Sequence, residues 1–189
     1  RLALNYVVIT SVTRDDLHDG GAEQFSRCIR LLRKAHPACT VEVLIPDFQG
    51  SLPALRTVTE AAPAVINHNM EVCKALFPEL RPDGDYDRSL ELLRRVRQYA
   101  PDIPTKSGFM IGLGEEKDQI IRLMADLRAA DCKRLTIGQY LQPTRNHRPV
   151  HKFYHPDEFA DFRQIALDMK FEAVMAGPLV RSSYHAAGM

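Results

Sequence analysis

The end of the chain carries two adjacent serines, within the run Arg181-Ser182-Ser183-Tyr184-His185-Ala186. The apolar residues before this run are typical of a strand, so we expect the fold to deliver the two hydroxyl groups to a fixed point. A pair of serines can also form a plain turn or cap a helix. The run is therefore a candidate site that needs support from other residues.

A glycine-rich segment, residues 108–115, indicates a short buried strand that opens onto a helix. Glycines at such a junction allow a flat ligand to lie against the backbone. Close packing of a helix on a strand favours glycine at the same place, so this segment alone is a weak signal.

A third segment, Asn67-His68-Asn69-Met70-Glu71, follows a strand-like run over residues 64–66. Two amides and a carboxylate at alternating positions are well placed to hydrogen-bond the hydroxyl groups of a ribose. An Asx turn that caps the next helix would use the same residue types.

Six segments together resemble the lipoyl synthases, a family of radical S-adenosylmethionine enzymes. The resemblance runs over essentially the whole chain in the family's order, and the final RSSY is specific to that family. The segments are TSVTRDDLHDGGA (10–22), EVLIPDFQG (42–50), NHNMEV (67–72), IPTKSGFMIGLGE (103–115), LTIGQYLQPT (135–144) and GPLVRSSYHA (177–186).

The resemblance implies an enzyme that inserts two sulfur atoms into C–H bonds of an octanoyl chain carried on a lysine of a lipoyl domain. No side-chain acid or base removes such a hydrogen, so cofactors must supply the chemistry. The implied cofactors are S-adenosylmethionine and two four-iron, four-sulfur (4Fe-4S) clusters. The implied partners are octanoylated lipoyl domains, namely the E2 subunits of 2-oxoacid dehydrogenases and the glycine cleavage H protein.

The cysteines depart from the family's pattern. The family holds one cluster on a CxxxCxxC loop and the other on a cysteine triplet upstream of it, whereas Cys28, Cys39, Cys73 and Cys132 are spaced far more widely. We expect none of them to be a cluster ligand. Arg1 stands just before the strand that comes second in the family's barrel. The chain is thus expected to lack the N-terminal third with both cysteine motifs, and to be inactive by itself.

The family's site residues carry over to several positions of this chain. Ser183 is the expected ligand of the sulfur-donating cluster, with Ser182 the less favoured neighbour. A cluster that must be dismantled benefits from one ligand that is harder than thiolate, and an alkoxide oxygen fits that description. Asn69 and Glu71 match the positions that hold the ribose of S-adenosylmethionine.

The glycine-rich segment matches the G-x-I-x-G-x-x-E pattern beside the adenine, at Gly108, Met110, Gly112 and Glu115. Met110 replaces an isoleucine, with little change in volume.

Four further residues are expected to position substrate or cofactor. Arg14 and Asp16, with Asp15 between them, match the region that meets the methionyl end, although Thr13 stands where an aspartate is expected. Lys106 and Arg181 are expected to point toward the opening of the same site.

Composition restricts the class of protein. The 189 residues are 45% hydrophobic, enough for one core of ordinary size. The 25 basic and 24 acidic residues nearly cancel, so no global field recruits nucleic acid or a membrane. Apolar runs are too short to span a bilayer, and we expect no secretion signal. We expect a cytoplasmic protein, or a mitochondrial matrix protein if the source is eukaryotic.

Strand-like and helix-like segments alternate, which predicts an α/β protein: a partial TIM-like barrel of parallel strands and outer helices, without its first strand. We expect a barrel over residues 1–176 and a C-terminal extension over 177–189. Cys28, beside Phe25 and Ile29, is expected to be a buried thiol. Predicted strands cover 5–12, 40–45, 64–67, 105–111, 134–141 and 171–176, and predicted helices cover 22–35, 52–61, 89–100, 117–130 and 157–169, with loops at 77–86 and 143–155.

Two other functions remain open. A biotin-synthase-like sulfur insertion enzyme shares the NHN-x-carboxylate signature, but RSSYHA argues against it. The missing cysteines also allow a cluster-free scaffold that binds lipoyl domains or a nucleotide without turnover.

Overall fold

The computed structural model describes residues 4–183 and 186–188. Six strands alternate with helices, as the sequence pattern predicts. The strands are β1 (Tyr6–Thr10), β2 (Thr40–Leu44), β3 (Val65–Asn67), β4 (Thr105–Ile111), β5 (Arg134–Gln139) and β6 (Ala173–Gly177). The α-helices are α1 (Ala22–Ala35), α2 (Leu52–Glu60), α3 (Phe77–Leu80), α4 (Tyr86–Tyr99), α5 (Lys117–Ala129) and α6 (Pro156–Asp168). Short 3-10 turns are η1 (Phe48–Gly50), η2 (Lys74–Leu76) and η3 (Ala186–Gly188).

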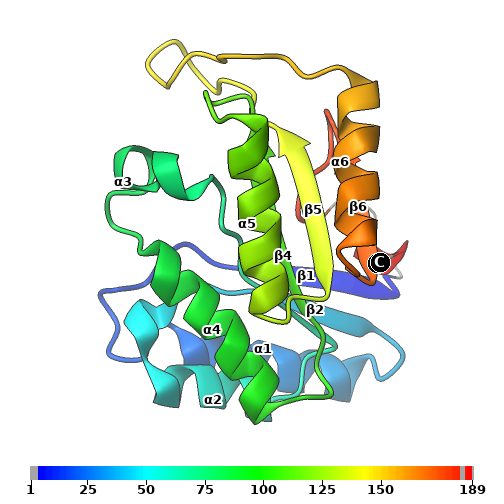
Figure 1. Cartoon of the computed structure of the whole chain (residues 1–189). Coiled ribbons are helices and arrows are strands. Elements are labelled where there is room, and N and C mark those ends of the chain that lie inside the picture. The colour runs from blue at the N-terminus through cyan, green and yellow to red at the C-terminus, as the bar shows by residue number, and fades with distance from the viewer. Residues whose placement is uncertain (1–3, 184–185, 189) are drawn as a thin grey trace.

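The strands form one parallel sheet in the order β1-β2-β3-β4-β5-β6, so each strand pairs with the next one along the chain. Helix α1 packs on β2 and α2, α4 packs on β4, and α6 packs on β6 (Figure 1). Within the described residues, β1 and β6 are the edges of the sheet. This is the α/β architecture that the alternation predicts.

The hydrophobic core lies between the sheet and these helices. On β2, Val41 and Val43 belong to this core, while Glu42 between them is fully buried on the opposite, inner face of the sheet. The two faces of β2 therefore have different chemistry: the outer face packs apolar side chains, and the inner face carries a charge.

Most predicted boundaries hold within a few residues, and the exceptions have local causes. Helix α4 begins at Tyr86, three residues before its predicted start, because the Asp85 side chain accepts a hydrogen bond from the backbone N–H of Arg88. Strand β6 begins at Ala173 because Lys170, with φ of 69°, turns the chain first. The predicted loop over 77–86 contains helix α3, with Pro78 in its first turn.

The prediction for Cys28 was wrong. The buried residues of α1 are Ala22, Phe25, Ser26 and Ile29, and Cys28 lies outside this stripe and is exposed. None of the helices in the described part of the chain is long and apolar enough to cross a membrane.

Leu93→Ala tests the contribution of the core. Leu93 of α4 is fully buried, so its truncation is expected to lower the free energy of unfolding by about 2–5 kcal/mol. Leu31→Ala on α1 is the matched control, because Leu31 is 56% exposed and should change stability by less than about 0.5 kcal/mol. Urea denaturation measures both. Equal losses in the two variants would contradict the placement of α4.

Candidate functional site

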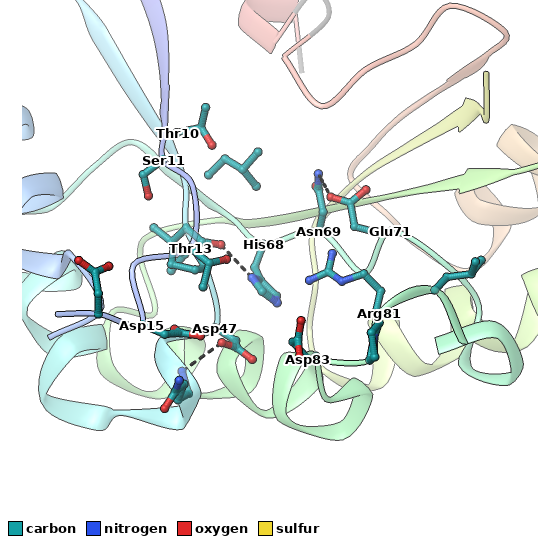
Figure 2. A pocket seen from close by; sticks show the side chains of 18 residues that line it. Thr10, Ser11, Thr13, Asp15, Asp47, His68, Asn69, Glu71, Arg81 and Asp83 are labelled. Carbon is teal, nitrogen blue, oxygen red and sulfur yellow. Dashed lines mark hydrogen bonds between the residues drawn. The ribbon is translucent and has the colours of Figure 1, made fainter. Parts of the chain in front are cut away.

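A cavity of about 940 Å³ lies at the carboxyl ends of β1, β2 and β3. Its lining brings together segments far apart in the sequence, from Thr10 at the end of β1 and Asp15 after it to Asn69 and Glu71 after β3 (Figure 2). Ligand sites of parallel α/β proteins lie at this end of the strands. Of the residues expected to hold the cofactor, Asn69 and Glu71 line this cavity, whereas Gly108, Met110, Gly112 and Glu115 do not.

Asn69 and Glu71 form a pair at the edge of this cavity. The Asn69 Nδ2 donates a hydrogen bond to Glu71 Oε1 at 3.1 Å (Figure 2). Asn69 Oδ1 is buried and has no partner within the described structure, so it is available to a donor such as a sugar hydroxyl.

The backbone of Glu71 is held in a rare conformation. Its φ is 67°, in the left-handed region that costs a residue with a Cβ about 1–3 kcal/mol. Two hydrogen bonds to β4 hold it there: its N–H donates to Gly108 O at 3.1 Å, and its carbonyl accepts from Met110 N at 2.8 Å. A strained backbone held on both sides points to a functional position.

Gly108 is a point of close packing beside Asn69. A Cβ at this position would lie 2.4 Å from Thr136 Oγ1 and 3.1 Å from Asn69 Oδ1. The missing side chain therefore lets Thr136 and Asn69 pack directly against the backbone of β4.

The carboxylate of Glu115 is used by the chain itself. It accepts hydrogen bonds from Gly112 N at 2.6 Å, from Leu113 N at 3.0 Å and from Tyr154 Oη at 3.1 Å. Gly112 has φ of 105°, which favours glycine, and Glu115 is buried. Glu115 therefore fixes the turn after β4. Its role is to shape the backbone of the segment that was expected to lie beside the adenine.

His68 is a site residue that the sequence prediction missed. Its Nδ1 lies 2.9 Å from the carbonyl oxygen of Ile45, which can only accept, so Nδ1 carries the proton. Burial lowers the pKa of the ring, which keeps it neutral. Nε2 is then a buried acceptor with no partner among the described residues, on a ring that lines the cavity (Figure 2). In the sequence, its position between two asparagines was the feature that could have identified it.

The cavity is acidic. One arginine, Arg81, and five carboxylates line it: Asp15, Asp16, Asp47, Glu71 and Asp83. Arg14 does not line it but binds Asp16, with Nη2 2.6 Å from Oδ2, and the guanidinium lowers the pKa of that exposed carboxyl. Such a lining favours a ligand with positive charge.

Lys106 and the C-terminal serines meet on the inner face of the sheet. The Lys106 ammonium is fully buried and donates to Glu42 Oε1 at 3.0 Å and to the carbonyl of Ser182 at 2.7 Å. Ser182 and Ser183 lie in a turn, where Ser182 is half-buried and Ser183 is exposed. Arg181 is exposed, and its Nη1 donates to the carbonyl of Val180. Tyr184 and His185 lie outside the described residues.

The four cysteines do not gather. Cys28 is exposed and Cys39 half-buried, while Cys73 and Cys132 are buried, and burial raises the pKa of each of these two thiols to about 12. In the part of the chain that the structure describes, no three His, Cys, Asp or Glu side chains form a group that could hold a metal ion.

Curated relatives identify the family. The chain is 54% identical over 185 residues to the lipoyl synthase of Halalkalibacterium halodurans and 52% identical over 185 residues to that of Caldicellulosiruptor bescii. Each alignment covers 98% of this chain. This chain belongs to the lipoyl synthase family. It spans 61% and 64% of the lengths of these two lipoyl synthases. No family model matches the sequence.

Solved structures support the fold of this lipoyl synthase homologue. Methylornithine synthase superposes with a TM-score of 0.66 at 12% identity, over 95% of this chain and 59% of that one. A domain of pyruvate-formate lyase-activating enzyme from Bacteroides vulgatus gives 0.60 at 12% identity, over 89% of this chain and 98% of that domain.

Gly108→Ala tests the close packing of Thr136 and Asn69 on β4. The new methyl group would collide with Thr136 Oγ1, so we expect the free energy of unfolding to fall by about 1–3 kcal/mol. Thr136→Ala removes that hydroxyl, and the double variant should recover much of the loss. A double-mutant cycle by urea denaturation gives the coupling. Additive effects of the two substitutions would show that the crowding is absent.

Proposed function

We propose that this chain forms the cofactor-binding and substrate-facing part of a lipoyl synthase, which inserts two sulfur atoms into the octanoyl chain of a lipoyl domain. The observation that carries the proposal is the meeting of Asn69 and Glu71 at one cavity, in a chain about half identical to curated lipoyl synthases. The reaction class is that of a radical S-adenosylmethionine sulfurtransferase.

The cavity suits S-adenosylmethionine. Asn69 Oδ1 and the free acceptor capacity of Glu71 face the place of a ribose, and the close packing at Gly108 holds Asn69 against β4. The carboxylates of the lining favour a sulfonium and an ammonium group. When bound, the cofactor supplies the radical chemistry that abstracts hydrogen from the octanoyl chain. The protein's residues bind and orient it.

The residues of this chain do not suit a 4Fe-4S cluster by themselves. Such a cluster needs four ligands, usually thiolates, and the four cysteines lie apart. Ser183 is exposed in its turn and offers one hydroxyl oxygen, whereas the carbonyl of Ser182 is bound by Lys106. We therefore assign Ser183 as the single ligand that this chain contributes. The remaining ligands of both clusters must come from elsewhere.

The proposed partners are octanoylated lipoyl domains, those of 2-oxoacid dehydrogenase E2 subunits and the glycine cleavage H protein. Family membership supports this assignment, and the same argument favours a cytoplasmic or, in a eukaryote, mitochondrial matrix location. The dispersed cysteines favour one second candidate, a scaffold that binds lipoyl domains or a nucleotide without turnover.

The 189-residue chain alone is expected to hold no 4Fe-4S cluster and to insert no sulfur, because it offers one serine and four dispersed cysteines. Anaerobic reconstitution, desalting and iron analysis with electron paramagnetic resonance test this. Iron that survives desalting at four atoms per chain would contradict it.

Ser183→Ala tests the ligand assignment in a chimaera that adds the rest of a matched lipoyl synthase to this chain. We expect Ser183→Ala to abolish formation of the lipoyl product. Release of 5′-deoxyadenosine, the product of S-adenosylmethionine cleavage, should be largely retained, because the serine is separate from the cofactor cavity. Ser182→Ala should be milder, and Glu71→Ala should reduce 5′-deoxyadenosine first. Both products are measured by mass spectrometry. A harsher effect at Ser182, or equal loss of both products in Ser183→Ala, would overturn the assignment.

A further inference from the structure

Lys106 is a charged side chain with no exposed surface, located near the start of β4. Its ammonium has two described partners: Glu42 Oε1 at 3.0 Å and the carbonyl oxygen of Ser182 at 2.7 Å. One partner comes from β2, and the other comes from the segment that follows β6. Burying a lysine is costly unless its charge is paired and hydrogen-bonded, so both contacts have to form for the side chain to remain in this place.

Glu42 is itself held in place from two other strands. Tyr6 Oη of β1 donates to Glu42 Oε2 at 2.5 Å, and Asn67 Nδ2 of β3 donates to Oε1 at 3.4 Å. Burial lowers the pKa of the Lys106 ammonium, and the Glu42 carboxylate opposes this shift. The carboxylate therefore holds the ammonium at a fixed point on the inner face of the sheet, with one donor directed at Ser182.

The same C-terminal segment meets the sheet at two further points. A Cβ at Gly138 of β5 would lie 2.4 Å from the carbonyl oxygen of Val180, so the segment occupies the space that a side chain would need. Beyond the serines, η3 contacts β1, and Ala186 in η3 is buried. The segment thus leaves β6, passes β5 and β4, and reaches β1.

We infer that Lys106, fixed by Glu42, is the positioning residue that seats this C-terminal segment (residues 178–183 and 186–188) across the inner face of the sheet. It acts by binding the carbonyl of Ser182, which directly precedes Ser183. The claim that this contact presents Ser183 to an iron–sulfur cluster rests on the proposed function. The claim that Lys106 seats the segment does not rest on it, because the contacts described above lie within the chain itself.

Limited trypsin digestion of the native chain tests the seating. Arg181 is exposed but lies inside the segment, so cleavage after it requires the segment to open, whereas Arg145 in the loop between β5 and α6 is an internal reference. Lys106→Met keeps most of the length of the side chain and removes the ammonium. We expect cleavage after Arg181 to become roughly tenfold faster, the change that loss of one hydrogen bond to a charged group produces, with cleavage after Arg145 unchanged.

Two controls separate local seating from general stability. Lys133→Met removes a lysine paired with Asp131 and Glu172, and cleavage after Arg181 should stay at the wild-type rate. Glu42→Gln/Lys106→Met leaves no unpaired buried charge, so its melting temperature should recover relative to Lys106→Met while cleavage after Arg181 stays fast. This double variant also keeps the test decisive if the single variant fails to fold.

Wild-type cleavage after Arg181 in the double variant, or equal acceleration after Arg145, would overturn the inference. The cluster is tested separately in the chimaera, where Lys106→Met should lower the iron content while Lys133→Met leaves it at the wild-type level. If Lys106→Met shows fast cleavage after Arg181 but full iron content, the inference that Lys106 seats the segment stands, and its link to Ser183 as a cluster ligand is contradicted. An inactive wild-type chimaera would count against the proposed function alone.

Discussion

The carboxylate of Glu42 is the interaction on which the inner face of the sheet depends. A phenol from β1, an amide from β3 and an ammonium from β4 all donate to it, so one buried anion links four strands. A buried charge of this kind is tolerable only when its partners are in place, and a satisfied network then allows few alternative arrangements. The sheet therefore gains a polar centre with defined geometry where apolar side chains would pack less specifically.

The candidate site depends on this rigidity. Strand β3 ends at Asn67, which contacts Glu42, and the chain reaches Asn69 and Glu71 within four further residues. The left-handed backbone of Glu71 is then held by two hydrogen bonds to β4. Side chains that bind a ligand are placed more accurately by such fixed backbone than by a free loop. The strain at Glu71 is thus compatible with a stable fold because both neighbouring strands are fixed.

Local signals in the sequence were enough to predict the sheet, the helices and the segments that form the cavity. Strand β4 and helix α1 have the predicted bounds, because apolar periodicity and helix termination are read within a few residues. The pairing of Lys106 with Ser182 could not be predicted, since 76 residues separate them and no local pattern reports it. His68 was missed for a related reason: its free acceptor depends on the carbonyl of Ile45, which directly follows the neighbouring strand β2. Cys28 shows the limit of periodicity, because a position at the edge of an apolar stripe can fall on either side.

The strand order has a consequence for synthesis. Since each strand pairs with the one made just before it, the sheet can grow from β1 to β6 as the chain emerges from the ribosome, with one crossover connection to close at each step. The segment after β6 behaves differently, because η3 contacts β1, which is made well before it. This segment cannot dock until β1 to β6 have been made. The serines therefore reach their place only on a sheet whose six described strands are already assembled.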